Sequence, residues 1–300
     1  MDFTEEQRDR VWGIAYRMLG SPDDADDVVQ EARLRWLAAD REAIRTPEAW
    51  LVSVATRLAI DTLRRAKRER AEYTGPWLPA PARIAADSGP DRDAEMASDL
   101  SLAFLHLLER LRPEERAAFL LREVFGVGYG PIAEVLERSE ASCRQMVRRA
   151  RLRVREGPRL VEASAEEKAE LAGRFVRAIE ARSHDELMEL LAPEATHLTD
   201  GGGRVWAALR EIRGADPVAR GLLGAARKMS ERTRFEQRFG VVNGEPAVLQ
   251  YADGQLASVS TLVVREGRVI RILTVLNPDK LARTVADGRS AGPGAPGPTP

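Results

Sequence analysis

Residues 131–155 read PIAEVLERSEASCRQMVRRARLRVR. Pro131 opens a short apolar helix that ends near Glu137, and a basic helix follows from Ser139 to Arg155. Two short helices joined by a few residues, the second rich in arginine, form the helix-turn-helix pattern of DNA-binding proteins. The competing interpretation is a solvated charged face, which the position behind a capped helix and a turn disfavours.

The second helix of this pattern has side chains suited to both parts of a DNA contact. Ser142, Arg144 and Gln145 lie in its first turn, where side chains reach base edges in a major groove. Later arginines are placed to hold phosphates. They are Arg148, Arg149, Arg151, Arg153 and Arg155, against the single acid Glu140.

Two charged clusters lie further upstream, on predicted helices that begin at Ser21-Pro22 and Thr46-Pro47. The helix that begins at Thr46-Pro47 carries a basic cluster. This helix and the basic helix from Ser139 to Arg155, joined by a flexible linker, could bind two separated stretches of one DNA duplex. The first helix carries an acidic run from Asp23 to Glu31. The helix dipole accounts for its first acids, whereas the full run with Gln30 suits a protein partner. The basic cluster comprises Arg57, Arg64, Arg65, Lys67, Arg68 and Arg70.

Residues 73–97 are rich in Pro, Gly, Ala and Asp, and the segment 75–81 cannot be helical. We interpret 73–97 as a linker. Trp77 and Leu78 lie between its prolines, and such apolar side chains predict that the linker docks onto another surface.

The chain beyond Gly157-Pro158 changes to an α+β pattern. Turn signals separate its strands and predict successive hairpins in an antiparallel meander. The turns are Asn243-Gly244, Asp253-Gly254 and Glu266-Gly267. The expected helices are Glu166–Ala181, Asp185–Leu191 and Asp216–Met229, and the expected strands are Thr196–Thr199, Arg234–Val242, Ala247–Tyr251, Leu256–Arg265 and Arg268–Leu276.

Composition excludes several classes of protein. The net charge of the 300 residues is only −1, so a nucleic-acid surface requires local clustering of charge. The lone Cys143 excludes an internal disulfide framework, and the three histidines lie too far apart in sequence to resemble a metal-ligand set. We expect no cofactor and no metal. Without a secretory signal or an apolar run of about 20 residues, we expect a cytoplasmic protein and no membrane partner.

Motifs across the first half of the chain resemble those of extracytoplasmic-function (ECF) sigma factors. Region 2 of that family is resembled by Arg17-Met18-Leu19-Gly20, by Asp23 to Glu31, by Ala49-Trp50-Leu51 and by Ala59 to Arg65. Region 4 is resembled by Tyr129 through Arg151, and the whole likeness covers residues 1–156.

A subgroup likeness extends to about residue 285. Four motifs are similar to those of the SigJ-like subgroup, which carries a C-terminal SnoaL-like (NTF2-like) domain. They are Ser142-Cys143-Arg144-Gln145, Trp77-Leu78-Pro79-Ala80-Pro81, Asp200-Gly201-Gly202-Gly203-Arg204 and Asn277-Pro278-Asp279-Lys280-Leu281. The chain departs from the family pattern at Ala80, Arg204 and Glu137, and Glu137 leaves the turn geometry of the helix-turn-helix open.

The resemblance implies a multidomain fold. Two all-α sigma domains, a region 2 helical bundle and a region 4 helix-turn-helix, precede an α+β SnoaL/NTF2-like cone with a curved antiparallel sheet. The expected divisions are region 2 at 1–72, the linker at 73–97, region 4 at 98–156, the SnoaL-like regulatory domain at 160–285 and a disordered tail at 286–300.

The resemblance also implies partners and contact residues. Region 2 would bind the β′ clamp helices of core RNA polymerase and the −10 promoter element, while region 4 would contact the polymerase β flap and the −35 element. Residues implied in polymerase binding are Asp24, Asp27, Gln30 and Glu31. The −10 set is Arg41, Arg45, Arg57, Asp61, Arg64, Arg65 and Arg68; the −35 set is Ser142, Arg144, Gln145, Arg148, Arg149 and Arg151.

The C-terminal motifs and the linker motif are expected to form a regulatory interface. This interface would set the equilibrium between a polymerase-competent and a closed state, and a small-molecule ligand in the cup of the SnoaL-like domain would shift that equilibrium. Its residues are Trp77, Leu78, Pro79, Asp200, Gly201, Gly202, Gly203, Arg204, Asn277, Pro278, Asp279, Lys280 and Leu281. One alternative is a one-component DNA-binding regulator that senses a ligand. Another is a cyclase or isomerase fused to a DNA-binding module, with candidate acid–base residues His197, Asp200, Tyr251 and Asp253.

Overall fold

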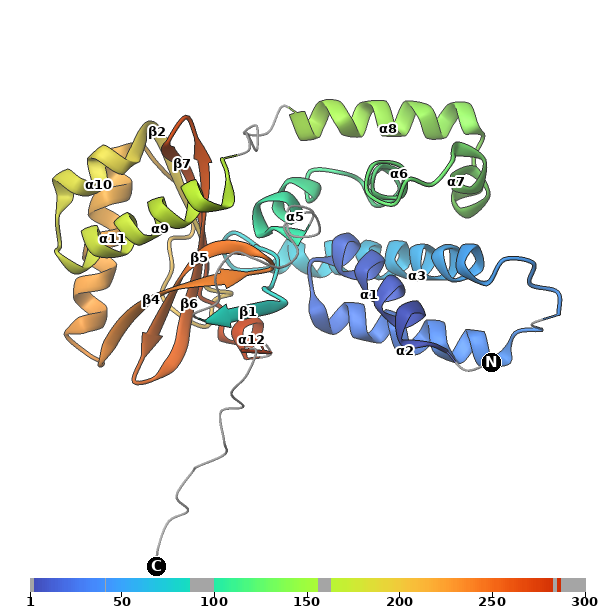
Figure 1. Ribbon diagram of the computed structural model, residues 1–300, viewed down its shortest axis with the longest axis horizontal. Coiled ribbons are helices and arrows are strands. Elements are labelled where there is room, and N and C mark those ends of the chain that lie inside the picture. Colours follow the sequence, from blue (N-terminus) through green and yellow to red (C-terminus); the bar gives the residue numbers. More distant parts are fainter. Residues whose placement is uncertain (1–2, 41, 87–99, 156–162, 283–284, 287–300) are drawn as a thin grey trace, which may run out of the picture.

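A computed structural model describes residues 3–40, 42–86, 100–155, 163–282 and 285–286. The N-terminal unit is a bundle of three helices (Figure 1). Thr4 and Ser21 cap the first two helices with their side chains, and Pro22 and Pro47 occupy the first turns of the second and third. The helices are α1 (Glu5–Leu19), α2 (Pro22–Ala38) and α3 (Pro47–Glu69), followed by the short η1 (Arg70–Glu72).

The second helical unit contains the expected helix-turn-helix. Its helices are α5 (Leu102–Leu108), α6 (Pro113–Glu123), α7 (Tyr129–Leu136) and α8 (Glu140–Arg155). Glu137 ends α7 in the left-handed region at φ 54°. The turn that usually favours glycine therefore forms here with a glutamate, at a conformational cost of about 1 kcal/mol.

The two helical units share one hydrophobic core. Residues of α1 and α3 pack with residues of α6, α7 and α8 in a single cluster. Arg116 of α6 is 1% exposed, and its guanidinium donates to the carbonyl of Met18 in α1 at 2.7 Å and to that of Leu108 at 3.0 Å. Because α1 ends there, Arg116 satisfies one of the carbonyls that a helix end leaves unpaired.

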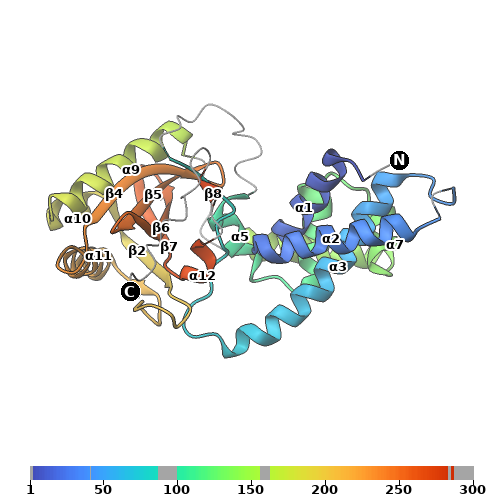
Figure 2. The same cartoon turned by 90° about the horizontal axis from the view of Figure 1, so that it is seen from below.

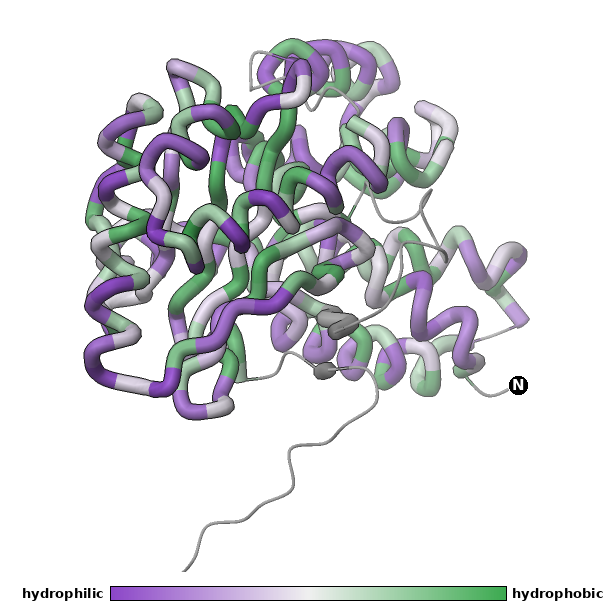
Figure 3. Tube along the Cα trace, turned by 60° about the vertical axis from the view of Figure 1, so that its left-hand side comes forward, coloured by the Kyte–Doolittle hydropathy of each residue, from purple (hydrophilic) through white to green (hydrophobic). Residues whose placement is uncertain are grey.

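The C-terminal unit is a sheet covered by three helices, as Figures 1 and 2 show. The helices are α9 (Ala165–Glu180), α10 (His184–Leu190) and α11 (Ala215–Ser230), with α12 (Pro278–Leu281) at the opposite side. The strands are β2 (Leu191–Asp200), β3 (Ile212–Arg213), β4 (Phe235–Val242), β5 (Glu245–Ala252), β6 (Gln255–Arg265) and β7 (Arg268–Val275). Figure 3 shows hydrophobic segments along these strands.

The sheet is mixed, and this corrects the expectation of an antiparallel sheet. Strands β4 to β7 form the expected meander, with all three predicted turns at the tips. However, β2 lies parallel to β7. The linker contributes a strand of its own, β1 (Arg83–Ala86), which pairs with β4 antiparallel and with β8 (Val285–Ala286) in parallel.

The sheet has a core on each face. One face packs on α9, α10 and α11. The other packs on the linker and on α5, because Leu78, Leu102 and Ala103 join its strands in one cluster. The sheet therefore holds the linker and the second helical unit against itself by apolar burial, worth roughly 1.5–3 kcal/mol for a fully buried leucine.

Candidate nucleic-acid interface and interdomain junction

Helix α8 turns its basic face to solvent. Arg144, Gln145 and Arg148 are exposed, and Ser142 is half-buried, while Cys143 and Met146 of the same helix pack into the core. Arg144 donates to Glu140 at 2.6 Å and lies over the Tyr129 ring at 5.1 Å. An exposed ion pair is worth about 0–1 kcal/mol, so a phosphate or a guanine can compete for this guanidinium.

Other arginines of α8 pair with acids of α6. Arg151 donates to Glu123 at 2.7 Å, and Arg149 lies 3.9 Å from the buried Glu115, which also pairs with Arg153. All three arginines remain exposed or partly exposed. The six residues of the −35 set therefore share one helix, and all of them are exposed or half-buried.

The −10 set is placed differently, because two of its residues contact the helix-turn-helix unit. Arg57 donates to the carbonyls of Val135 at 3.1 Å and Glu134 at 3.1 Å, and lies 3.6 Å from the Glu137 carboxylate. This guanidinium caps the C-terminal end of α7, where helix carbonyls lack partners.

Arg64 makes the second contact, to Glu114 of α6 at 2.5 Å, and it also pairs with Asp61 at 3.0 Å. Arg65 and Arg68 of the same helix are exposed, as is Arg45 in the preceding loop. Arg41 lies outside the described residues. The six described residues of the −10 set are thus all exposed, and two of them, Arg57 and Arg64, contact the second helical unit.

Helix α2 exposes most of the residues implied in polymerase binding. Asp27 and Gln30 are exposed, and Glu31 pairs with Arg35 at 2.8 Å. Leu34 and Leu37 follow at helical spacing, and they are 62% and 51% exposed. The sequence interpretation missed these leucines, although their spacing from Asp27 and Gln30 puts them on one helix face.

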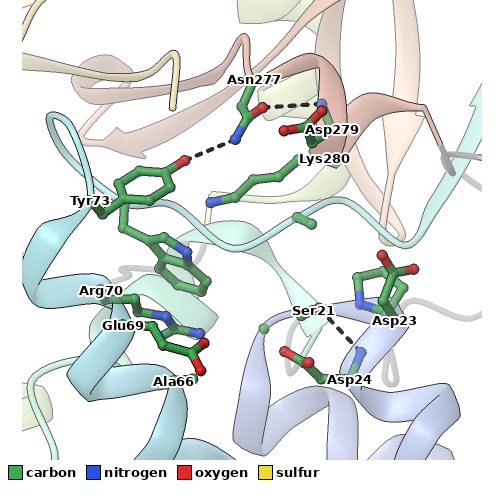
Figure 4. Close-up of a pocket in the computed structure, with 14 residues that line it drawn as sticks. Ser21, Asp23, Asp24, Ala66, Glu69, Arg70, Tyr73, Asn277, Asp279 and Lys280 are labelled. Atoms are coloured by element: carbon green, nitrogen blue, oxygen red, sulfur yellow. Dashed lines mark hydrogen bonds between the residues drawn. The ribbon is translucent and has the colours of Figure 1, made fainter. Parts of the chain in front are cut away.

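Asp24 points elsewhere, into a junction between the N-terminal unit, the linker and the C-terminal unit. Figure 4 shows it among residues that line a cavity of about 320 Å³. Partial burial raises the pKa of its carboxyl group above the ordinary value. Asp24 is therefore turned away from the surface that Asp27 and Gln30 form.

Asp200 is the centre of this junction. Its side chain is fully buried and accepts hydrogen bonds from the Tyr73 hydroxyl at 2.6 Å, the Leu78 amide at 2.8 Å and the Gly202 amide at 3.1 Å. The Lys280 ammonium lies 2.6 Å from the same carboxylate. One carboxylate thus joins the linker, the Gly-rich turn and α12.

Lys280 is held as tightly as its partner. It donates to the Leu78 carbonyl at 2.5 Å and lies over the Trp77 ring at 4.2 Å. Burial lowers its pKa to about 8. Arg70 of η1 stacks on the same Trp77 ring at 3.4 Å, so the indole lies between cations of two units.

The Gly-rich turn fits this junction only because it lacks side chains. Gly202 has φ 59°, and an added Cβ would lie 2.9 Å from the Tyr73 hydroxyl and collide with the Asn277 amide. Gly201 and Gly203 are similarly enclosed, by Val205 and Thr74. Asn277 donates to the Tyr73 hydroxyl at 2.9 Å, and it caps α12.

The remaining motif residues complete the same contact. Arg204 pairs with Asp279 at 3.1 Å on the outside of the junction. Pro79 packs against Gly20, and Leu78 and Leu281 are buried in the cluster on the sheet face. Pro278 takes the first position of α12.

The candidate acid–base residues of the C-terminal unit do not converge. His197 and Asp200 differ by an odd number of positions on β2, so their side chains point to opposite faces of the sheet. His197 bonds the Thr274 hydroxyl at 2.9 Å, whereas Asp200 faces the linker. Asp253 lies exposed at a hairpin tip. The structure therefore does not bring His197, Asp200 and Asp253 together.

Within the part of the chain that the structure describes, no helix is long and apolar enough to cross a membrane. Among those same residues, no three side chains of His, Cys, Asp or Glu gather in a group that could hold a metal ion.

Comparisons with known proteins agree with the two helical units. Residues 3–69 match the family model of Sigma-70 region 2, and residues 101–154 match that of Sigma-70 region 4. The chain is 37% identical over 298 residues to the ECF RNA polymerase sigma factor SigJ of Mycobacterium tuberculosis, covering 96% of this chain and 95% of that protein. It is 31% identical over 270 residues to the probable ECF RNA polymerase sigma factor SigI of the same species, covering 89% and 90%.

A solved structure extends the likeness to the whole fold. The crystal structure of the M. tuberculosis ECF sigma factor SigJ matches with a TM-score of 0.75 at 33% identity, covering 93% of this chain and 97% of that one. The likeness includes the C-terminal unit as well as both helical units. The chain therefore belongs to the family of ECF RNA polymerase sigma factors.

Proposed function

We propose that the chain directs promoter-specific initiation as an alternative sigma factor of core RNA polymerase, and that the described arrangement is its closed state. In this proposal residues 1–72 recognise the −10 element, residues 98–156 recognise the −35 element, and residues 160–285 regulate both through the linker 73–97. The protein works where polymerase and promoter DNA are found, in the cytoplasm.

The contact between Arg57 and α7 carries the proposal of a closed state. The −10 and −35 elements lie about 25 base pairs apart, which is about 85 Å at roughly 3.4 Å per base pair. Arg57 of the −10 surface nevertheless touches the helix-turn-helix unit at 3.1 Å. Both DNA surfaces cannot contact one promoter in this arrangement, so the helical units must separate when transcription starts.

The polymerase surface supports the same function. Asp27, Gln30, Leu34 and Leu37 form a face of α2 that is acidic and polar at one end and apolar at the other. Exposed leucines on one helix face are suited to burial against a partner helix. We assign this face to the β′ clamp helices, and the second helical unit to the β flap.

The C-terminal unit regulates by holding the closed state. Asp200 and Lys280 fix the linker, which begins directly after the helix that carries the −10 set. A small molecule in the cup would shift this balance only through different affinities for the closed and open states. Truncation after residue 157 is therefore expected to change promoter output.

Reconstituted transcription tests the function directly. Purified chain is mixed with core polymerase and a promoter selected from the protein's own binding sites, and full-length and truncated proteins are compared at equal concentration. Run-off transcripts that depend on the chain and on intact −10 and −35 sequences are expected. A chain that binds promoter DNA but never directs core polymerase would instead be a one-component regulator, in which the exposed face of α2 has no use.

A further inference from the structure

The tip of the β4–β5 hairpin lies inside the molecule instead of at its surface. Asn243 and Gly244 form a two-residue turn between the paired residues Val242 and Glu245, with φ 53° and 83°. Such turns require positive φ at both positions, which accounts for the Asn-Gly sequence. Asn243 is nevertheless only 4% exposed, whereas turn tips ordinarily face solvent.

The Asn243 side chain contacts three other parts of the chain. Its amide nitrogen donates to the Tyr16 hydroxyl of α1 at 2.8 Å and to the Leu100 carbonyl, just before α5, at 2.9 Å. Its amide oxygen accepts from the Ala82 amide of the linker at 3.0 Å. Both helical units and the linker therefore meet the C-terminal unit at one carboxamide.

The Tyr16 hydroxyl has its own fixed role in this contact. It is fully buried, and it donates its proton to the Ala80 carbonyl at 2.7 Å while it accepts from Asn243. Burial raises the pKa of this phenol, so it stays protonated. The Ala80 amide in turn donates to the carbonyl of Gly20, at the end of α1.

Only asparagine meets both requirements at this position. Glycine would satisfy the turn but would supply no amide, and an ionised aspartate would have no donor for Tyr16 or Leu100. The equivalent first positions of the other two hairpins, Asp253 and Glu266, also have positive φ but are exposed. The turn conformation alone therefore does not explain the buried contacts of Asn243.

We infer that Asn243 is a positioning residue that ties both helical units and the linker to the C-terminal sheet in the closed state, through partners that Asp200 does not contact. The inference rests on the proposed function, because the closed and open states that Asn243 would influence are the two states of the proposed sigma factor. Loss of the tie is expected to loosen α1, the linker and the start of α5 together, while the hairpin itself remains formed.

The decisive variant is Asn243→Gly, which removes the carboxamide and keeps the positive φ. Glu266→Gly is the matched control, since it makes the same backbone change at an exposed hairpin tip. Hydrogen exchange of full-length protein should show faster exchange at the Ala82 amide and at the end of α1, by about fivefold for each hydrogen bond of ordinary net strength. Glu266→Gly should leave these amides unchanged.

A second variant separates the tie from a local effect on the hairpin. Tyr16→Phe removes the hydroxyl and its bonds to Asn243 and to the Ala80 carbonyl, but it keeps the Asn243 oxygen that accepts from the Ala82 amide, so exchange at Ala82 should rise less than in Asn243→Gly. Transcription with limiting core polymerase should rise several-fold for Asn243→Gly, because the closed state would be less populated. Exchange at Ala82 that rises as much in Tyr16→Phe as in Asn243→Gly, unchanged exchange in Asn243→Gly, or unchanged or lower output in an assay in which the wild-type chain is active would overturn the inference. Failure of the wild-type chain to direct transcription would refute the proposed function, while exchange at Ala82 still reports on the tie.

Discussion

At the scale of single residues, the junction depends on buried polar groups whose partners come from distant parts of the chain. Asp200 accepts from four donors, and three of them belong to other segments than its own turn. Leaving a buried ionic group without its partner costs about 3–5 kcal/mol, whereas an exposed pair contributes little. Neutralising the buried Asp200 should therefore destabilise the fold much more than neutralising the exposed Asp279.

Asp200→Asn is expected to lower the free energy of unfolding by about 3 kcal/mol, because the amide leaves Lys280 buried without a counter-charge. Asp279→Asn, which breaks only the exposed pair with Arg204, is expected to cost less than about 1 kcal/mol. Urea denaturation followed by fluorescence of Trp77 and the other tryptophans measures both. Equal losses for the two variants would contradict the buried ion pair as the source of stability.

One buried and one half-buried histidine, His197 and His106, predict acid sensitivity. Burial lowers the pKa of His106 and that of His197 to about 4, below the unfolded value of about 6.5. Between these values the unfolded chain binds protons that the folded chain does not, so stability is complete above pH 6.5 and falls toward pH 4. Each histidine contributes a slope of about 1.4 kcal/mol per pH unit. A His106→Gln, His197→Gln variant should show a flatter dependence in urea denaturation at several pH values; an unchanged slope would contradict the assignment.

At the scale of elements, α8 should determine −35 selectivity, because its basic face is exposed in the closed state. Arg144→Ala is expected to lose about 1–3 kcal/mol of discrimination between cognate and mutated −35 sequences, as for a bidentate contact to guanine. Arg155→Ala, at the far end of the helix, should weaken both sequences about equally and reduce the salt dependence of binding. Binding measured by fluorescence anisotropy at two salt concentrations separates the effects. If Arg144→Ala retained its selectivity for the −35 sequence, Arg144 would not be the residue that recognises the base.

Local patterns predicted the elements well, since their signals lie within a few residues. Asn243-Gly244 marked a hairpin, and Pro131 marked a helix near its true start at Tyr129. Long-range pairing could not be read in this way. The strand β1 forms only because the edge of β4 accepts it, and β2 lies parallel to β7 although the hairpins suggested an antiparallel sheet.

The same distinction between local and long-range signals holds for the functional residues. Composition and spacing identified the arginines of α8 and the docking of Trp77, because each belongs to a short motif. The contact of Arg57 with Val135 and that of Asn243 with Tyr16 join residues separated by 78 and 227 positions. No local pattern carries such information, since either side chain would look the same at an exposed site.

At the scale of the whole molecule, the closed state predicts that the two helical units move far apart when the protein binds core polymerase and promoter DNA. Asp9 on α1 and Leu152 on α8 are exposed, and neither is one of the residues assigned to promoter DNA or to the β′ clamp helices. Cysteines at both positions can carry a fluorophore pair, because the native Cys143 is buried and its thiol pKa is raised, so it reacts slowly.

Energy transfer between these labels should be high in the free chain and should fall when core polymerase and promoter DNA are added, as the helical units separate toward the roughly 85 Å that the promoter imposes at about 3.4 Å per base pair. Promoter DNA alone should leave the transfer high, because α8 can bind while the contacts of Arg57 and Arg64 persist. The Asn243→Gly variant should open at lower polymerase concentration than the wild-type chain, and Glu266→Gly should not. A transcribing complex that retains the energy transfer of the free chain would contradict the separation of the two units.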